Sequence, residues 1–163
     1  MPYISPVEYN EKRIHAAAVY CSDGRVGEHF DDFLQNGLCL PRYDRVALPG
    51  GPARLAEFDK PSIEKQAVLA ELKFLVDAHE LNRVILIQHE NCAFYKHHLN
   101  LSGDALRPRQ AEDLGRAALT IAEATGLKQI EAYHAQPTPK GMTFTPVEID
   151  QPTVKTTSRS QTA

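Results

Sequence analysis

The sequence lacks the long apolar segments that membrane proteins need. No apolar run approaches the ~20 residues that cross a bilayer, so we expect no membrane partner. Residues 1–6 also lack the charged segment followed by an apolar one that marks a secretory signal peptide. We therefore expect a cytoplasmic protein.

Basic residues are too few for a protein that binds nucleic acid. The 18 lysines and arginines are outnumbered by 21 aspartates and glutamates, and the formal net charge is −3 with the histidines neutral. The basic residues are scattered along the chain and form no basic arm. We therefore expect no nucleic-acid partner, because such proteins concentrate positive charge against the phosphate backbone.

Cysteine is scarce, with only Cys21, Cys39 and Cys92. An odd number of cysteines in a chain without a secretory signal argues against a disulfide framework. Cysteines in a reducing compartment serve as packing residues, metal ligands or reactive thiols. Cys39 has no motif beside it, and we interpret it as a packing residue. Cys21 and Cys92 each lie within a short polar motif.

The sequence does contain a regular alternation of apolar runs and amphipathic segments. Its 163 residues are the size of one domain, and an apolar fraction of 42% is sufficient for one core. Apolar and β-branched runs predict strands over 15–20, 45–48, 83–88, 129–135 and 142–149. Helical spacing predicts helices over 27–36, 62–80 and 110–125, with Gly37 and Gly126 as stops.

This order of elements predicts an α/β layer fold with a mostly parallel sheet. A turn at 137–141 makes the last strand an antiparallel edge. Residues 1–150 are expected to form a single domain, within which the first dozen residues are an arm or a short docking segment. The polar, Thr- and Ser-rich residues 151–163 are expected to be a disordered tail.

Two short segments begin where apolar strands end, and they carry the chemistry. The first is Cys21-Ser22-Asp23-Gly24-Arg25, and the second is His89-Glu90-Asn91-Cys92. In open α/β sheets, ligands bind beyond the carboxyl ends of the strands, where the winding reverses. If the strand order is 2-1-3-4, the strands before the two segments are neighbours at that point. Cys21, His89 and Cys92 are then expected to meet.

Two thiolates and one imidazole form a plausible zinc site. Zinc prefers sulfur and nitrogen donors in a tetrahedral shell, and three protein ligands leave one position for water, as in catalytic sites. Bound zinc makes a hydroxide nucleophile near neutral pH. Cys21, His89 and Cys92 are therefore our candidate ligands for Zn²⁺, with a small molecule as substrate.

Asp23 and Arg25 lie beside this candidate metal site. The Asp23 carboxylate has two possible roles: it closes the site as a fourth ligand, or it accepts a hydrogen bond from zinc-bound water. Arg25 would hold it in the second role through a bidentate pair. Competition between Arg25 and zinc for Asp23 would make a switch.

At these residues the chain resembles the β-class carbonic anhydrases, which carry Cys-x-Asp-x-Arg after one core strand and His-x-x-Cys after a later one. The likeness covers roughly residues 14–149. It implies a flavodoxin-like three-layer fold with sheet order 2-1-3-4-5, zinc on Cys21, His89 and Cys92, and the Asp23–Arg25 dyad beside it. It also implies a homodimer or a dimer of dimers, because the family's active sites lie at subunit interfaces.

The resemblance predicts reversible hydration of carbon dioxide to bicarbonate by zinc-bound hydroxide, as in a carbonate dehydratase. The sequence departs from the family pattern at 47–51, where Arg-Asn-Ala-Gly is usual, at Ala93, where glycine is usual, and in its short N-terminal arm. These departures surround the substrate pocket and spare the proposed ligands. Two alternatives therefore stay open: a hydrolase of carbonyl sulfide or carbon disulfide, with an apolar pocket around Leu48 and Phe94, and a non-catalytic zinc-binding regulatory module.

Two further features have ordinary interpretations. Gly50-Gly51 lacks the G-x-G-x-x-G pattern and the Walker lysine of nucleotide sites. We interpret the two glycines as residues that let the backbone pass through a tightly packed region near the pocket. Imidazole in general is suited to shuttling protons near neutral pH, which makes His97 and His98 candidates, although an exposed pair without a function is the more common case.

Overall fold

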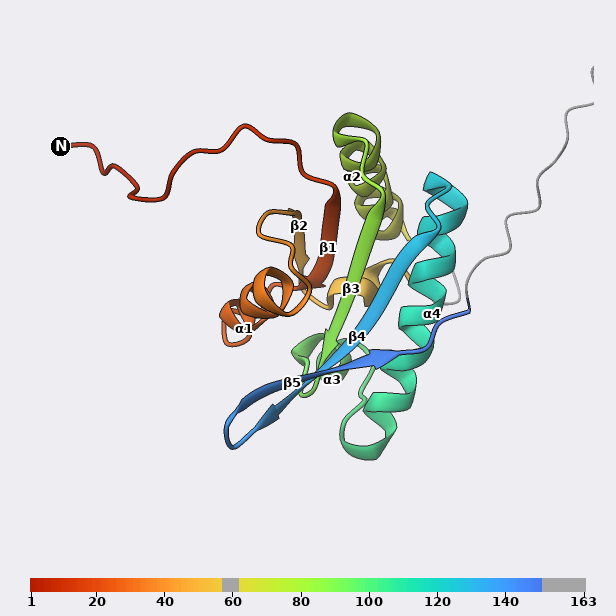
Figure 1. The fold of residues 1–163 in the computed structure, drawn as a ribbon. Helices are drawn as coiled ribbons and strands as arrows, with labels where there is room; N and C mark the ends of the chain where they lie inside the picture. The colour runs from red at the N-terminus through yellow and green to blue at the C-terminus, as the bar shows by residue number, and fades with distance from the viewer. Residues whose placement is uncertain (57–61, 151–163) are drawn as a thin grey trace, which may run out of the picture.

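A five-stranded sheet with helices on both faces makes up the described part of the chain, in the computed structural model shown in Figure 1. The structure describes residues 1–56 and 62–150, so the tail expected at 151–163 lies outside the described residues. In chain order the elements are β1 (Ala16–Cys21), α1 (Gly27–Asp32), η1 (Phe33–Gly37), β2 (Asp44–Leu48), η2 (Gly51–Arg54), α2 (Ile63–His79), β3 (Arg83–His89), α3 (Ala93–His98), η3 (Gly103–Ala105), α4 (Leu106–Thr125), β4 (Gln129–Thr138) and β5 (Gly141–Val147).

The sheet has the order β2-β1-β3-β4-β5, which is the predicted flavodoxin-like order. The pairs β1–β2, β1–β3 and β3–β4 are parallel, whereas β5 lies antiparallel to β4. Because β1 and β3 are parallel neighbours, their carboxyl ends lie at the same edge of the sheet.

Helices cover both faces of the sheet, and this covering makes three layers (Figure 1). Ala17 and Val19 of β1 pack on the side of α2 and α4, whereas Ala16 and Ala18 pack on the side of α1. Every residue of β1 is buried, as expected for a parallel strand covered on both faces. Among the described helices, none combines the length and apolar character that a membrane span requires.

The predicted strands are all present, but two helix predictions need correction. Helix α4 begins at Leu106, four residues before the predicted start at 110. Pro108 lies in its first turn, where the missing N–H of proline is tolerated. The helix predicted over 27–36 is α-helical only to Asp32 and continues as a π-helical turn to Gly37.

Cys39 is exposed, so its interpretation as a packing residue is wrong. It follows the π-helical turn and has a left-handed backbone with φ of 54°. The irregular end of this helix turns Cys39 away from the core, and no periodicity in the sequence predicts that direction.

Candidate metal centre

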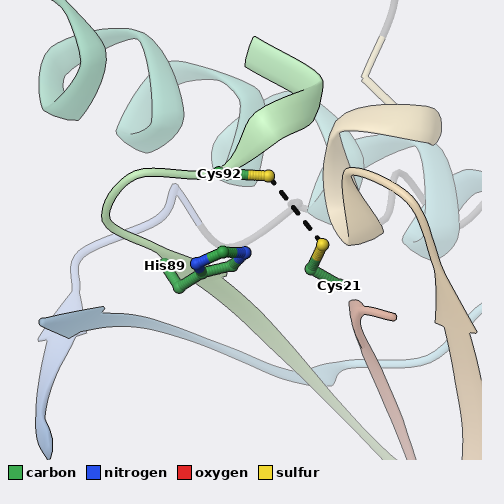
Figure 2. Close-up of side chains that lie close together, drawn as sticks. All are labelled: Cys21, His89 and Cys92. Atoms are coloured by element: carbon green, nitrogen blue, oxygen red, sulfur yellow. Dashed lines mark hydrogen bonds between the residues drawn. The ribbon is translucent and has the colours of Figure 1, made fainter. Parts of the chain in front are cut away.

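The structure brings Cys21, His89 and Cys92 together at the carboxyl edge of the sheet (Figure 2). One ligand atom from each residue lies within 4.8 Å of the other two, and the two sulfur atoms are 3.9 Å apart. All three residues are buried, with exposed fractions of 6%, 1% and 1% respectively.

The sheet places two of these residues, and a turn places the third. Cys21 is the last residue of β1 and His89 the last residue of β3. The chain then turns through Asn91, which has a left-handed φ of 57°. This turn brings the chain back, so that Cys92 directly precedes α3 and faces Cys21.

The His89 ring is fixed so that one nitrogen faces the two sulfurs. Its Nδ1–H donates to the backbone oxygen of Glu90 at 2.9 Å, which leaves Nε2 as the lone-pair nitrogen of the neutral ring. Nε2 is buried and has no hydrogen-bond partner among the described residues. The Gln110 amide donates to the His89 backbone oxygen at 2.8 Å and holds the end of β3. Such an arrangement presents Nε2 to a metal ion.

A hydrogen bond joins the two cysteine side chains, whose sulfur atoms lie 3.9 Å apart. The Cys92 thiol donates to the Cys21 sulfur, which lowers the pKa of Cys21 and raises the pKa of Cys92. To a smaller extent the backbone N–H of Gly50 lowers the pKa of Cys21, and those of Phe94 and Tyr95 act on Cys92 in the same direction. Of the two sulfurs, that of Cys21 therefore carries negative charge more readily in this buried site.

Asp23 and Arg25 form a bidentate ion pair beside the cluster. Arg25 Nε donates to both carboxylate oxygens at 3.0 and 3.1 Å, and Nη2 donates to Oδ2 at 2.5 Å. The Arg25 backbone N–H also bonds Oδ1 at 3.0 Å. These hydrogen bonds lower the pKa of Asp23 to about 2, so this carboxylate is ionised throughout the physiological range.

Removal of this guanidinium is expected to raise the pKa of Asp23. In Arg25→Met the hydrogen-bonded cation is lost while the backbone N–H bond remains, so the pKa should rise towards, but not reach, its ordinary value of ~3.9. A ¹³C NMR titration of the Asp23 carboxyl carbon measures this shift. An unchanged pKa in the variant would mean that the ion pair does not exist in solution.

Among the described residues, two cavities touch the cluster, and Arg25 and Asn91 line both of them. The first, of about 320 Å³, touches Cys92 and also has Lys96 and His97 in its wall. The second, of about 250 Å³, touches His89 and is lined by Val26 and Met142, among others. Arg25 therefore lies in the wall of each cavity that touches a cluster residue.

Gly50 and Gly51 are required by close packing, as the sequence predicts. A Cβ at Gly50 would lie 2.6 Å from the ring of Phe94, and one at Gly51 would lie 2.7 Å from the backbone of Tyr20. Both glycines have positive φ, of 86° and 50°. The loop after β2 is thus wedged between α3 and the end of β1.

Sequence reasoning missed the buried polar residues behind the cluster, which are Gln88, Tyr95, Gln110, Asp113 and His134. Gln88 interrupts the apolar run of β3 just before His89. Gln110 and Asp113 lie on the inner stripe of α4 with Leu114 and Ala117, where apolar residues are expected. The sequence signal that could have identified these residues is a polar residue at a position where an apolar core residue is expected.

The fold and the cluster together define an α/β protein with a cysteine–histidine–cysteine site at the carboxyl edge of a flavodoxin-like sheet. The family model described as "Putative carbonic anhydrase" matches residues 11–138, which is most of the chain. The protein therefore belongs to this carbonic anhydrase family. No curated protein sequence matches the chain.

Solved β-carbonic anhydrases share the fold at low sequence identity. For β-carbonic anhydrase isoform I from Trichomonas vaginalis the TM-score is 0.51 at 12% identity, over 86% of this chain and 87% of that one. For CafA from Aspergillus fumigatus the TM-score is 0.43 at 14% identity, over 82% of this chain and 76% of that one. The first of these structures places the chain among proteins with the β-carbonic anhydrase fold.

Proposed function

We propose that the protein is a zinc-dependent carbonic anhydrase that hydrates carbon dioxide to bicarbonate at Cys21, His89 and Cys92. Membership of the family supports the reaction, and the cluster supports the metal. The observation that carries the proposal is the His89 ring: one of its nitrogens lies within 4.8 Å of both sulfurs, and its buried Nε2 has no hydrogen-bond partner among the described residues.

The donor set fits zinc in both chemistry and spacing. Two sulfurs at ~2.3 Å from a tetrahedral zinc ion are ~3.8 Å apart, and the sulfurs of Cys21 and Cys92 are 3.9 Å apart. A buried imidazole nitrogen without a partner would otherwise cost stability. A cation between these atoms would remove that cost and would take the place of the proton in the Cys92–Cys21 hydrogen bond.

Each residue has a separate task in the proposed reaction. Bound zinc supplies Lewis-acid chemistry, which lowers the pKa of water and makes it a nucleophile near neutral pH. Cys92 gives up its proton so that both sulfurs hold the cation, and for this reason cation binding strengthens as pH rises. Asp23 accepts a hydrogen bond from the attacking water and orients it, while Arg25 fixes the direction of that carboxylate.

Cationic groups in one cavity wall suit the anionic product of carbon dioxide hydration. Arg25 and Lys96 line the cavity beside Cys92, together with several apolar side chains. Within the part of the chain that the structure describes, Leu48 and Phe94 line neither this cavity nor the one on the other side of the cluster. Carbonyl sulfide or carbon disulfide therefore stays an alternative substrate, which an assay of sulfide release separates from carbon dioxide.

The non-catalytic alternative depends on Asp23 as a fourth zinc ligand. Asp23 accepts four hydrogen bonds from Arg25, counting the backbone N–H, which favours its role as an acceptor beside the metal over a role as ligand. The homodimer or dimer of dimers implied by the resemblance, and the cytoplasmic location expected from the sequence, are part of the same proposal.

Zinc-loaded protein is expected to accelerate carbon dioxide hydration, as measured by stopped-flow with a pH indicator. The rate should rise towards alkaline pH, because two thiolates would cancel the +2 charge of the ion and leave bound water less acidic than on a zinc held by neutral histidines. Sulfide release from carbonyl sulfide, measured on the same preparation, separates the alternative substrate. A rate equal to the uncatalysed background in protein that retains its zinc would support the non-catalytic module instead.

A further inference from the structure

Gln88 is a fully buried amide that directly precedes His89 on β3. Successive residues of a strand point to opposite faces of the sheet. The His89 ring lies against Phe30 on the α1 side, while the Gln88 side chain reaches Gly50 and Tyr95 on the other. Gln88 therefore lies directly behind the candidate metal centre.

The amide of Gln88 connects two segments through hydrogen bonds whose direction is fixed. Its Nε2 donates to the backbone oxygen of Gly50 at 3.2 Å and to the hydroxyl of Tyr95 at 3.0 Å. That hydroxyl donates in turn to Asp113 at 2.9 Å, and Asp113 accepts from Arg109 at 2.9 Å. The Tyr95 hydroxyl must accept from Gln88 because its own proton goes to the carboxylate.

The two segments joined by Gln88 each carry or contact one cysteine. Gly51 lies against the backbone of Tyr20 and Cys21 at the end of β1, and Gly50 directly precedes it. Tyr95 belongs to α3, which directly follows Cys92. One amide thus connects the loop beside Cys21 with the helix that follows Cys92.

Packing alone does not account for an amide at this position. The Oε1 atom of Gln88 is buried without a hydrogen-bond partner among the described residues. An unpaired buried acceptor costs stability, and an apolar side chain of similar shape would avoid that cost. The amide N–H groups are the part of Gln88 that makes hydrogen bonds, to Gly50 and to Tyr95.

We propose that Gln88 is a positioning residue of the metal centre, which sets the Cys21–Cys92 geometry by holding Gly50 and Tyr95. The inference rests on the proposed metal site but concerns its geometry and not the reaction. Outer hydrogen bonds of this kind commonly change metal affinity by ~10–100-fold. Burial raises the pKa of Tyr95, so its hydroxyl remains a donor to Asp113 and an acceptor from Gln88.

The test compares zinc affinity and cobalt spectra of Gln88→Met and Tyr95→Phe with those of the wild type. Methionine keeps the length of the side chain without its N–H groups, and phenylalanine removes only the hydroxyl. Competition with a chromophoric chelator should show zinc affinity lower by roughly ten-fold in both variants. The sulfur-to-cobalt charge-transfer band of the Co²⁺-loaded variants should shift from its wild-type position, because the two sulfurs would hold the ion in a changed geometry.

Tyr133→Phe is the matched control. It removes a tyrosine hydroxyl that also donates to a carboxylate, that of Glu131 at 2.9 Å, away from the cluster. Its zinc affinity and cobalt band should equal those of the wild type. If Gln88→Met and Tyr95→Phe behave like this control while the wild type binds zinc, the positioning role is wrong and the metal site stands. If the wild type binds no zinc, both proposals fail. Tyr95→Phe, the smaller change, decides the matter if Gln88→Met does not fold.

Discussion

Cys92→Ala should remove zinc from the protein and return carbon dioxide hydration to the uncatalysed rate. Zinc sites of four ligands bind the ion with ~10–16 kcal/mol, so one thiolate is worth ~3 kcal/mol, or at least ~100-fold in affinity. The variant also loses the sulfur that faces Cys21 at 3.9 Å. Metal analysis of purified protein and the stopped-flow rate measure the two effects.

Cys39→Ala provides the control for this substitution. Cys39 is exposed and lies outside the cluster, so its removal should leave zinc content and hydration rate unchanged. Full zinc content in Cys92→Ala would show that Cys92 is not a ligand. Zinc loss with an unchanged hydration rate would contradict the proposed reaction, because catalysis would then not need the metal.

The sheet and the meeting of the two motifs were predictable because both depend on local patterns. The continuous apolar run before His89 predicts a strand buried on both faces, and β3 is such a strand. Cys21 and His89 both follow apolar runs, so parallel pairing alone brings them to one edge. No long-range detail is needed for these predictions.

Short helices and the polar residues behind the site depend on tertiary contacts, and the sequence did not reveal them. Helix α3 has only six residues, too few for a periodic apolar stripe. Asp113 is tolerated in the core only because Arg109 and Tyr95 satisfy its carboxylate. Tyr95 comes from another element, so its role cannot be read from spacing along α4.

The loop at Gly50 and Gly51 combines a feature that the sequence predicts with one that only the tertiary contacts reveal. In the sequence the glycines mark a break after β2, and in the structure their missing side chains admit the ring of Phe94 and the backbone at Tyr20. The departure of this segment from the usual family pattern therefore has a physical consequence. The loop can approach close enough for Gly50 to accept a hydrogen bond from Gln88.

Gly51→Ala should lower both stability and zinc affinity. A Cβ at this position would lie 2.7 Å from the carbonyl carbon of Tyr20 and 2.8 Å from the nitrogen of Cys21, and the backbone φ is +50°. The left-handed conformation costs ~1–2 kcal/mol for alanine, and relief of the overlap costs ~1–3 kcal/mol more. The melting temperature should fall by roughly 5–15 °C. Because the overlap falls on Cys21 itself, zinc affinity should fall as well.

Gly115→Ala makes the same chemical change, but it is expected to raise the stability of the protein. Gly115 lies inside α4, and a Cβ there would meet nothing within 4 Å. Alanine in a helix interior is favoured over glycine by ~0.5–1 kcal/mol, so this variant should melt slightly higher and bind zinc as the wild type does. Thermal unfolding of the metal-free and zinc-loaded forms separates the two effects, since zinc should raise the melting temperature less in Gly51→Ala than in Gly115→Ala. Equal stabilisation of both variants by zinc would mean that the loop does not constrain the position of Cys21.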